Sequence, residues 1–170
     1  AAQVMGWGES GIIKVETNAF HQMDKRALRK AHEEAKNSGL EVLAIVGSAC
    51  TTSTGSFDDL EMMADFAVEN EVWFHVDGAY GLAALCAPSV RAKFNGVEKA
   101  DSFIVDPHKW LFAPFDACAL IYRNPELARE VHTQHATYLE TLHDGSWNPS
   151  DYAIHLTRRA RGLPFWFSLA

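Results

Sequence analysis

VWFHVDGAYG, residues Val72–Gly81, is the segment from which the architecture of this chain is most readily inferred. A short apolar run ends at the acid Asp77, and small residues then turn the chain; such runs are typical of buried strands. Ligands of open α/β sheets bind outside the carboxyl ends of the strands, so Asp77 is placed where a ligand-contacting acid should lie. A second interpretation stays open, in which Asp77 caps the following turn or helix.

The same arrangement recurs in DSFIVDPHKWLFAPFD, residues Asp101–Asp116. An apolar strand ends there and then presents Pro107, His108, Lys109 and Trp110. Of the seven lysines in the chain, Lys109 alone is enclosed by Pro, His, Trp, Leu and Phe. Desolvation disfavours the ammonium form of a lysine and makes a nucleophilic amine available. The alternative is a lysine whose stem covers an apolar patch while its amine stays in water.

Strand-like and helix-like patterns alternate along the rest of the chain. The strand-like runs lie at 11–17, 42–47, 72–77, 101–106 and 117–122, and the helix-like runs at 25–38, 60–70 and 125–134. Asp24 is a candidate cap for the first helix and Gly39 a natural stop. The apolar and small residues that share one helix face are Ala27, Leu28, Ala31 and Ala35 in the first helix and Leu60, Met63, Ala64 and Ala67 in the second. The apolar run Val42–Gly47 is typical of a parallel strand buried on both faces. This alternation predicts an α/β fold with a largely parallel sheet.

Composition narrows the class of protein. The 170 residues carry a net charge of −7, with 48% hydrophobic and 22% charged residues, which suits one domain with a substantial core. No long basic run suggests binding to nucleic acid, and no apolar run suggests a membrane span. The three cysteines, Cys50, Cys86 and Cys118, have no CxxC spacing. We therefore expect neither disulfides nor a zinc site, and a reducing compartment, the cytoplasm.

Two other motifs have a simpler explanation than chemistry. Gly6–Gly11 matches GxGxxG but has no strand before it, so a dinucleotide-binding turn is not expected. His132, His135 and His143 lie in polar sequence without a cysteine or carboxylate at ligand spacing. We expect them to be solvated loop residues, and we expect no metal.

Asp77 and Lys109 gain meaning as a pair. They are 32 residues apart, which is enough for one crossover between parallel strands. Both are therefore expected at the same edge of the sheet. A Schiff-base lysine and a carboxylate for a pyridinium nitrogen are the minimal set of groups that hold pyridoxal phosphate (PLP).

With these motifs in view, the chain resembles the group II PLP-dependent decarboxylases of fold type I, such as aromatic-L-amino-acid, histidine, diaminobutyrate and glutamate decarboxylases. The likeness runs from the ESG…VETN region to RRARGLPFWF, and HVDGAYG and DPHKWL are its most specific motifs. It implies a PLP-binding large domain with a mostly parallel sheet and helices on both faces. It also implies decarboxylation of an L-amino acid to an amine and CO₂, and a homodimer with the site at the interface.

The resemblance assigns roles to residues of both motifs. Lys109 would bind PLP covalently as a Schiff base, and Asp77 would pair with the pyridine nitrogen. Ala79 would be small because the ring packs against it. His108 and Asp106 resemble residues near the phosphate and the lysine. The family often has Asn at the position of Asp106, and a carboxylate there needs a donor partner because it repels phosphate.

Three further residues are assigned by the same likeness, each with an alternative. Thr52, in GSACTTSTGSFDDL, would touch the phenolic oxygen of the cofactor or the lysine, or it caps its turn. Tyr138 matches the tyrosine of the family's catalytic loop, which helps protonate the carbanion, or it is an anchoring aromatic. Arg158 aligns with a basic residue near the substrate, or it forms an ion pair with the acidic surface.

Aromatic side chains follow the lysine closely. Trp110, Phe112 and Phe115 are candidates for lining the place where the substrate carboxylate leaves water. For at least two of them, burial in the core is the simpler expectation.

The resemblance also predicts the extent of the domain. Residues 1–170 would be a truncated part of the PLP-binding large domain, without the upstream phosphate-binding loop and without the C-terminal small domain. Residues from about 132 to 147 would form a mobile catalytic loop. Two other functions stay open: another fold-type-I PLP enzyme, aldehyde-forming or a carbon–carbon lyase, and a non-catalytic dimerisation or binding domain.

Overall fold

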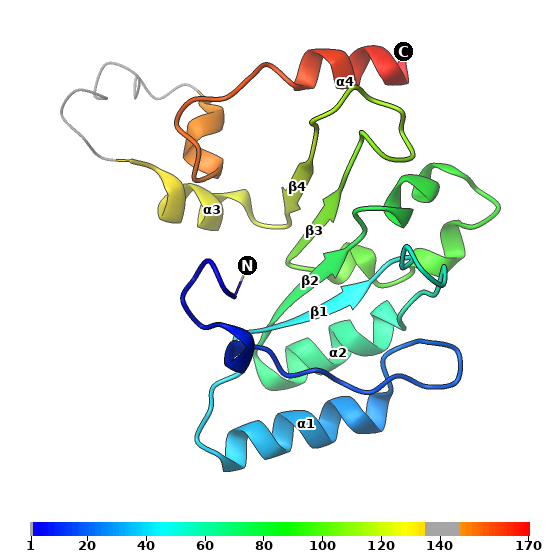
Figure 1. Cartoon of the computed structure of the whole chain (residues 1–170), viewed down its shortest axis with the longest axis vertical. Coiled ribbons are helices and arrows are strands. Elements are labelled where there is room, and N and C mark those ends of the chain that lie inside the picture. The colour runs from blue at the N-terminus through cyan, green and yellow to red at the C-terminus, as the bar shows by residue number, and fades with distance from the viewer. Residues whose placement is uncertain (1, 135–146) are drawn as a thin grey trace.

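A computed structural model describes residues 2–134 and 147–170 of the chain (Figure 1). The helices are α1 (Lys25–Asn37), α2 (Leu60–Asn70), α3 (Pro125–His132) and α4 (Gly162–Leu169). The strands are β1 (Ala44–Ser48), β2 (Trp73–Asp77), β3 (Ser102–Val105) and β4 (Ala119–Tyr122). Short 3-10 helices are η1 (Glu9–Gly11), η2 (Gly81–Cys86), η3 (Arg91–Phe94), η4 (Val97–Lys99) and η6 (Pro149–Tyr152).

The four strands form one sheet in the order β1-β2-β3-β4. The first three are parallel, and β4 is antiparallel to β3. Asp77 lies opposite both Ser48 and Ile104, while Val105 lies opposite Ala119. The ends of β1, β2 and β3 and the start of β4 therefore meet at one edge. The predicted α/β class with a largely parallel sheet is confirmed.

The core forms where α2 packs on β1 and β2. Leu60 and Met63 of α2 are buried together with Phe74 and Val76 of β2. Gly47 of β1 allows this close approach, because a Cβ there would lie 2.8 Å from the Met63 sulfur. The helix face predicted for this segment is the one that the structure buries.

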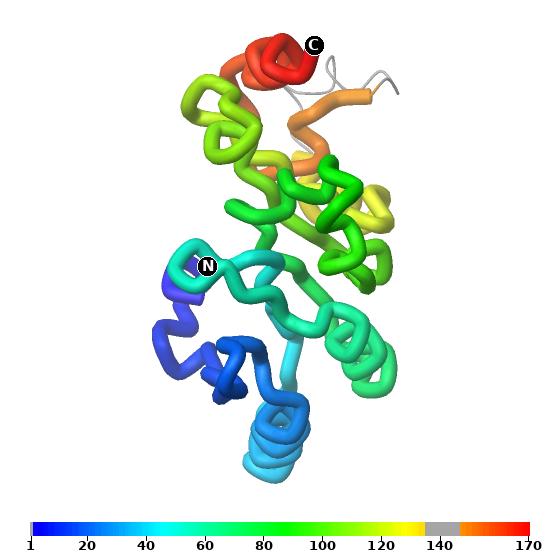
Figure 2. The backbone as a smooth tube through the Cα atoms, turned by 90° about the vertical axis from the view of Figure 1, so that its right-hand side faces the viewer, coloured from blue at the N-terminus to red at the C-terminus, as the bar shows by residue number. Residues whose placement is uncertain are grey.

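The opposite face of β1 is more open. Figure 2 shows α2 and the N-terminal segment on opposite sides of β1, and Val46 is 51% exposed. The expectation that this strand is buried on both faces is therefore wrong. The apolar run is typical of a strand buried on both faces, but only Ile45 and Gly47, which point toward α2, are buried. Helices were expected on both faces of the sheet. In the described residues, α2 covers one face.

The first helix matches its prediction closely. The Asp24 carboxylate accepts hydrogen bonds from the amides of Arg26 and Ala27 and so caps α1. Leu28 is buried toward the core, as the spacing predicts.

The strand predicted at 11–17 is not formed. Only Thr17 forms an isolated bridge, to Met23, and Ile12 and Ile13 are about half exposed. An alternating pattern makes a strand only where a neighbouring strand completes the hydrogen-bond ladder. None of the described strands forms a hydrogen-bond ladder with this segment.

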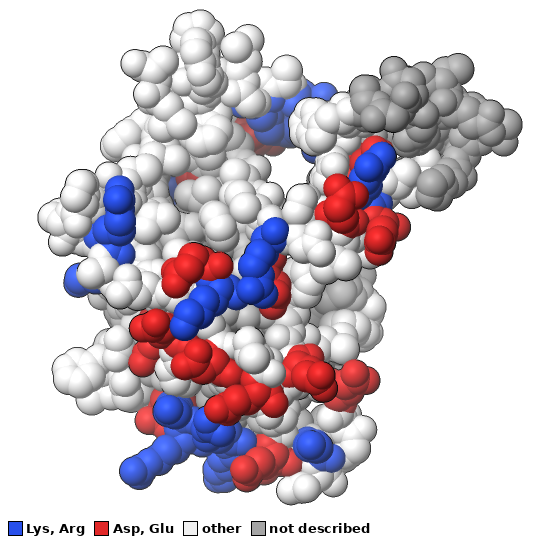
Figure 3. All heavy atoms as spheres, turned by 180° about the vertical axis from the view of Figure 1, so that it is seen from behind, with Lys and Arg blue, Asp and Glu red and all other residues white. Residues whose placement is uncertain are grey.

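Charges on the surface of the helices are mixed. Figure 3 shows acidic and basic side chains interleaved over one face. Arg29 pairs with Glu69, and Lys99 lies within 3.4 Å of Glu61.

No helix of the described residues is both long and apolar enough to cross a lipid bilayer.

Candidate active site

Three loops meet at the edge where the parallel strands end. The amide of Asp106, after β3, donates to the carbonyl oxygen of Ala79, after β2, at 3.0 Å. The loop after β1 touches the β2 loop so closely that a Cβ on Gly81 would lie 2.0 Å from the Cys50 Cβ. Only glycine fits this contact. The two sequence motifs therefore lie side by side, as their spacing predicts.

Asp77 is the last residue of β2, and its side chain is exposed at this edge. Its Oδ1 accepts a hydrogen bond from the Ala79 amide at 3.1 Å, so the turn-capping interpretation holds for one oxygen. The structure records no partner for Oδ2 among the described residues. One carboxylate oxygen thus caps the turn and the other is open to a donor on a ligand.

A small polar cluster lies behind Asp77 on the same face of the sheet. The indole Nε1 of Trp73 donates to the buried hydroxyl of Ser102 at 2.9 Å, and His75 Nδ1 lies 2.8 Å from that oxygen. Burial lowers the pKa of His75, although the charge of Asp77 opposes this shift. Sequence reasoning missed this cluster, because Ser102 is joined to the other two only through the strand register.

Lys109 is held by a tight turn over a buried proline. The Lys109 amide donates to the Asp106 carbonyl at 2.9 Å, and Pro107 is fully buried. This turn brings the side chain back, so that Nζ lies 2.8 Å from Asp106 Oδ2. The Lys109 side chain is 37% exposed and that of Asp106 15%. The amine is therefore both fixed in position and accessible to a ligand.

Asp106 has two side-chain donors. Burial works to raise its pKa, but the hydrogen bonds from Lys109 and Cys118 outweigh burial and lower the pKa. Burial and the neighbouring Asp106 raise the pKa of the Cys118 thiol to about 11. At neutral pH, Asp106 is therefore a carboxylate and Cys118 a protonated donor. The donor partner that we expected for the Asp106 carboxylate is therefore present, as Lys109 and Cys118.

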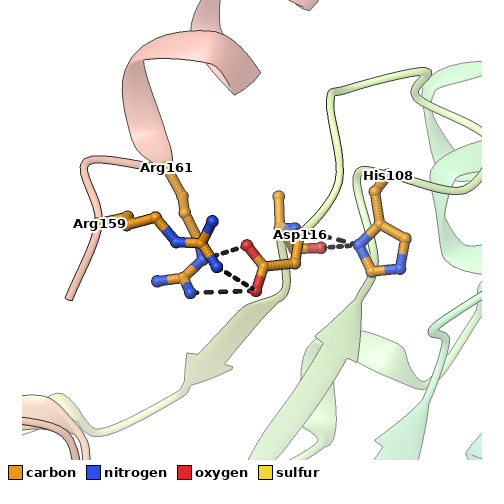
Figure 4. Close-up of polar contacts among 5 residues, drawn as sticks. His108, Asp116, Arg159 and Arg161 are labelled. Carbon is orange, nitrogen blue, oxygen red and sulfur yellow. Dashed lines mark hydrogen bonds and ion pairs between the residues drawn. The ribbon is translucent and has the colours of Figure 1, made fainter.

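His108 is oriented by the backbone just before β4 (Figure 4). The Ala117 amide donates to His108 Nδ1 at 3.1 Å, and the Ala117 carbonyl oxygen contacts the same nitrogen. Which of the two bonds forms depends on whether Nδ1 carries the proton. The ring also packs edge-on against Phe115, with centroids 5.1 Å apart. Among the described residues, His108 Nε2 has no recorded hydrogen-bond partner, so this nitrogen is open to other contacts.

Asp116, next to Ala117, is tied to the segment that precedes α4 (Figure 4). Arg161 Nε lies 2.9 Å from Oδ1 and its Nη2 3.1 Å from Oδ2, while Arg159 reaches Oδ2 at 3.4 Å. The Arg161 hydrogen bonds hold the pKa of Asp116 at about 2, well below its ordinary value. Sequence reasoning missed this pair, because residues more than forty positions apart leave no local pattern.

Two of the remaining predicted residues are exposed. Thr52 forms no side-chain hydrogen bond in the described part of the chain; Thr51 closes the turn instead, through Thr54 and Ser56. Arg158 donates to the carbonyl oxygen of His155 at 2.9 Å and forms no ion pair among residues 2–134 and 147–170. The ligand roles of Thr52 and Arg158 stay predictions.

Tyr138 lies outside the described residues, as does most of the loop predicted at 132–147. Its first residue, His132, is the last residue of α3. The catalytic role of Tyr138 and the mobility of this loop therefore also stay predictions.

The aromatic residues after Lys109 are not in the core. Trp110 is 44% exposed, Phe112 85% and Phe115 84%, so the expectation of core burial is wrong. These residues lie in the loop between β3 and β4, outside the core that α2 forms with β1 and β2. Trp110 packs against Tyr80 of the β2 loop, with centroids 4.7 Å apart. Exposed apolar side chains gathered near a polar site are typical of a binding surface.

The groups at this edge fit a pyridine aldehyde better than a metal. An accessible amine and an open carboxylate oxygen suit the aldehyde and the ring nitrogen. No group of three or more His, Cys, Asp or Glu in the described ranges could hold a metal ion. An accessible amine and an open carboxylate oxygen at the carboxyl edge of an α/β sheet are the groups that a lysine-bound pyridine aldehyde requires.

Comparison with known proteins gives the family. Residues 1–170 match the family model described as the pyridoxal-dependent decarboxylase conserved domain, and the chain belongs to this family. It is 33% identical over 171 residues to an aromatic-L-amino-acid decarboxylase of Bacillus atrophaeus, covering 99% of this chain and 36% of the relative. It is 37% identical over 147 residues to a 3,4-dihydroxyphenylacetaldehyde synthase of Aedes aegypti, covering 85% of this chain and 28% of that one.

A solved structure shows the same fold. The Oryza sativa protein TDC, solved with PLP and tryptamine, matches with a TM-score of 0.91 at 27% identity, covering 99% of this chain and 35% of that one. The chain thus spans about a third of the length of the relatives it matches.

Proposed function

We propose that the protein to which this chain belongs decarboxylates an L-amino acid, with PLP bound to Lys109. The observation that carries this proposal is the joining of the Asp77 and Lys109 loops at one sheet edge, through the hydrogen bond from Asp106 to Ala79. Bound PLP supplies an electron-withdrawing ring that stabilises negative charge on the substrate's α-carbon. The protein residues would orient the cofactor, pair with its charge and exclude water from the substrate carboxylate.

Asp77 and Ala79 would orient the cofactor ring. The open Oδ2 of Asp77 would accept a hydrogen bond from a protonated ring nitrogen, while its Oδ1 stays bound to the Ala79 amide. Ala79 has only a methyl group to place beneath the ring. His108 is fixed at Nδ1 by Ala117, which leaves Nε2 to contact the cofactor or the substrate. Thr52 would contact the phenolic oxygen of the cofactor or Lys109, Tyr138 would help protonate the reacting carbon, and Arg158 would lie near the substrate.

The exposed aromatic side chains would exclude water from the substrate carboxylate. Trp110, Phe112 and Phe115 lie within a few residues of Lys109 and are accessible. A carboxylate loses its hydration shell against such a surface, which favours loss of CO₂. The same exposed surface supports the proposal of a homodimer, in which a second subunit would cover it. We further propose a cytoplasmic enzyme of amino-acid metabolism.

A second candidate is an aldehyde-forming reaction on the same cofactor. It is favoured by the similarity to the Aedes aegypti protein that is named as an aldehyde synthase.

Product analysis tests the proposal. The full-length protein is incubated with PLP and a panel of aromatic and acidic L-amino acids, and the amine, CO₂, aldehyde and ammonia are quantified. The proposal predicts amine and CO₂ in equal amounts. Aldehyde with ammonia would establish the second candidate instead, and no product from a fully loaded protein would point to a non-catalytic binding domain.

A further inference from the structure

The carboxylate of Asp106 is committed to protein donors. Its Oδ2 lies 2.8 Å from Lys109 Nζ, and Cys118 donates a second hydrogen bond. The backbone of Asp106 is fixed as well, because its amide is bound to the Ala79 carbonyl oxygen. A carboxylate held in this way is not available to bind a phosphate, which it would repel.

We propose that Asp106 is the positioning residue of Lys109: its carboxylate holds the amine as an ammonium ion whenever that amine is not bonded to the cofactor. This inference rests on the proposed function, in which Lys109 carries PLP. Asp106 thereby sets where the free amine waits and how readily it becomes reactive.

Burial makes the contact effective. The Asp106 side chain is 15% exposed and that of Lys109 37%, so water screens this pair less than it screens the fully surface pairs of α1 and α2. A partly buried carboxylate is less stable without its partner, which favours keeping the ammonium in place. Cys118 strengthens the arrangement, because its thiol remains a donor over the physiological pH range.

The groups that face Asp106 come from three elements, and those of the first two are titratable. Its own loop contributes Lys109 and His108, and both favour the ionised carboxylate. The segment before β4 contributes the Cys118 thiol. The loop after β2 contributes a backbone carbonyl oxygen, that of Ala79.

The covalent step defines what the contact controls. The Lys109 ammonium first gives up one proton, and its neutral nitrogen then attacks the aldehyde carbon. A carbon–nitrogen double bond forms, the aldehyde oxygen leaves as water, and the nitrogen regains one proton. The ammonium and the aldehyde together contain all the atoms and charge of the protonated imine and water. Asp106 opposes the first loss of a proton, because a carboxylate stabilises the ammonium form.

The test follows the capture of PLP as a function of pH. Full-length protein free of cofactor is mixed with PLP, reduced with borohydride after fixed times, and the adduct on Lys109 is quantified by peptide mapping. Asp106→Asn removes the charge and keeps the shape. We expect this variant to capture PLP severalfold faster than the wild type near pH 6, and the difference to shrink as the pH rises, because no carboxylate then opposes the loss of the proton.

Three variants complete the design. Asp106→Glu restores the charge and should return the profile toward that of the wild type. Asp106→Ser is the second neutral variant, and must show the same increase in rate should the asparagine variant not fold. Asp65→Asn is the surface control, since Asp65 pairs with Lys99 at 3.6 Å, away from the site, and its profile should not change.

An unchanged pH profile in a folded neutral variant would refute the role of Asp106 while leaving Lys109 as the cofactor residue. A wild-type protein that captures no PLP on Lys109 would instead overturn the proposed function, and this inference with it.

Discussion

The amide of Asp106 donates a hydrogen bond to the carbonyl oxygen of Ala79 at 3.0 Å, and this bond joins the two motifs on which the account depends. Asp106 begins the turn that presents Lys109, and Ala79 ends the turn that fixes Asp77. The acid and the amine therefore share one backbone frame, although they follow different strands. A change that moves one turn should disturb the function of the other.

Replacing Asp77 by Asn should weaken the binding of PLP without unfolding the chain. Asparagine can still cap the turn at the Ala79 amide, but it has no negative charge to pair with a protonated ring nitrogen. A hydrogen bond to a charged group contributes about 1.5–3 kcal/mol, so we expect a loss of affinity of roughly ten- to a hundredfold. Equilibrium dialysis of the full-length protein measures it.

The control for Asp77→Asn is Asp59→Asn. Asp59 also caps a turn of the chain, by accepting from the Met62 amide, but it lies at the start of α2. PLP affinity equal to that of the wild type in both variants would exclude Asp77 as a cofactor ligand.

Gly81→Ala should destabilise the contact between the β1 and β2 loops on which the site rests. A Cβ at this position would lie 2.0 Å from the Cys50 Cβ and 2.5 Å from the Ala49 carbonyl oxygen, so the β1 and β2 loops must separate. Overpacking of this kind costs about 1–3 kcal/mol in the free energy of unfolding. Denaturant titration measures the cost, and PLP affinity should fall with it.

The matched variant is Gly162→Ala, where a new Cβ meets nothing within 4 Å. It should leave stability nearly unchanged. Equal stability of the two alanine variants would mean that the loops do not touch as described.

The ion pair of Asp116 with Arg161 should make stability depend on acid pH. The pKa of Asp116 is about 2 in the folded chain against an ordinary value of 3.8, so the pair stabilises the fold above pH 3.8. That contribution is lost as the pH falls from about 4 toward 2. Melting temperatures of wild type and Asp116→Asn should therefore differ at pH 6 and converge near pH 2. A difference that does not change with pH would contradict the pairing.

Local patterns predicted much of the fold. The Asp24 cap, the buried face of α2 and the strands at 42–47, 72–77, 101–106 and 117–122 all depend on neighbouring residues, and each is formed with small shifts of its ends. The strand at 11–17 failed, because a ladder partner is not a property of the segment itself.

The site was predicted less completely, for a similar reason. The meeting of Asp77 and Lys109 at one edge follows from the rule for parallel strands, and the exposed aromatic side chains do not. The exposure of these side chains depends on how the loop between β3 and β4 packs against the core, and no local pattern marks this packing. The contacts of Asp116 with Arg161 and of Asp106 with Cys118 are tertiary, and no spacing in the sequence marks them.

The most direct measurement is the site of covalent attachment of PLP. The full-length protein is loaded with PLP, reduced with borohydride, digested and mapped by mass spectrometry, alongside Lys109→Ala and the surface control Lys99→Ala. We expect one reduced adduct, on Lys109, which is absent from Lys109→Ala and retained in Lys99→Ala. An adduct on another lysine of the wild-type protein, or none at all, would contradict it.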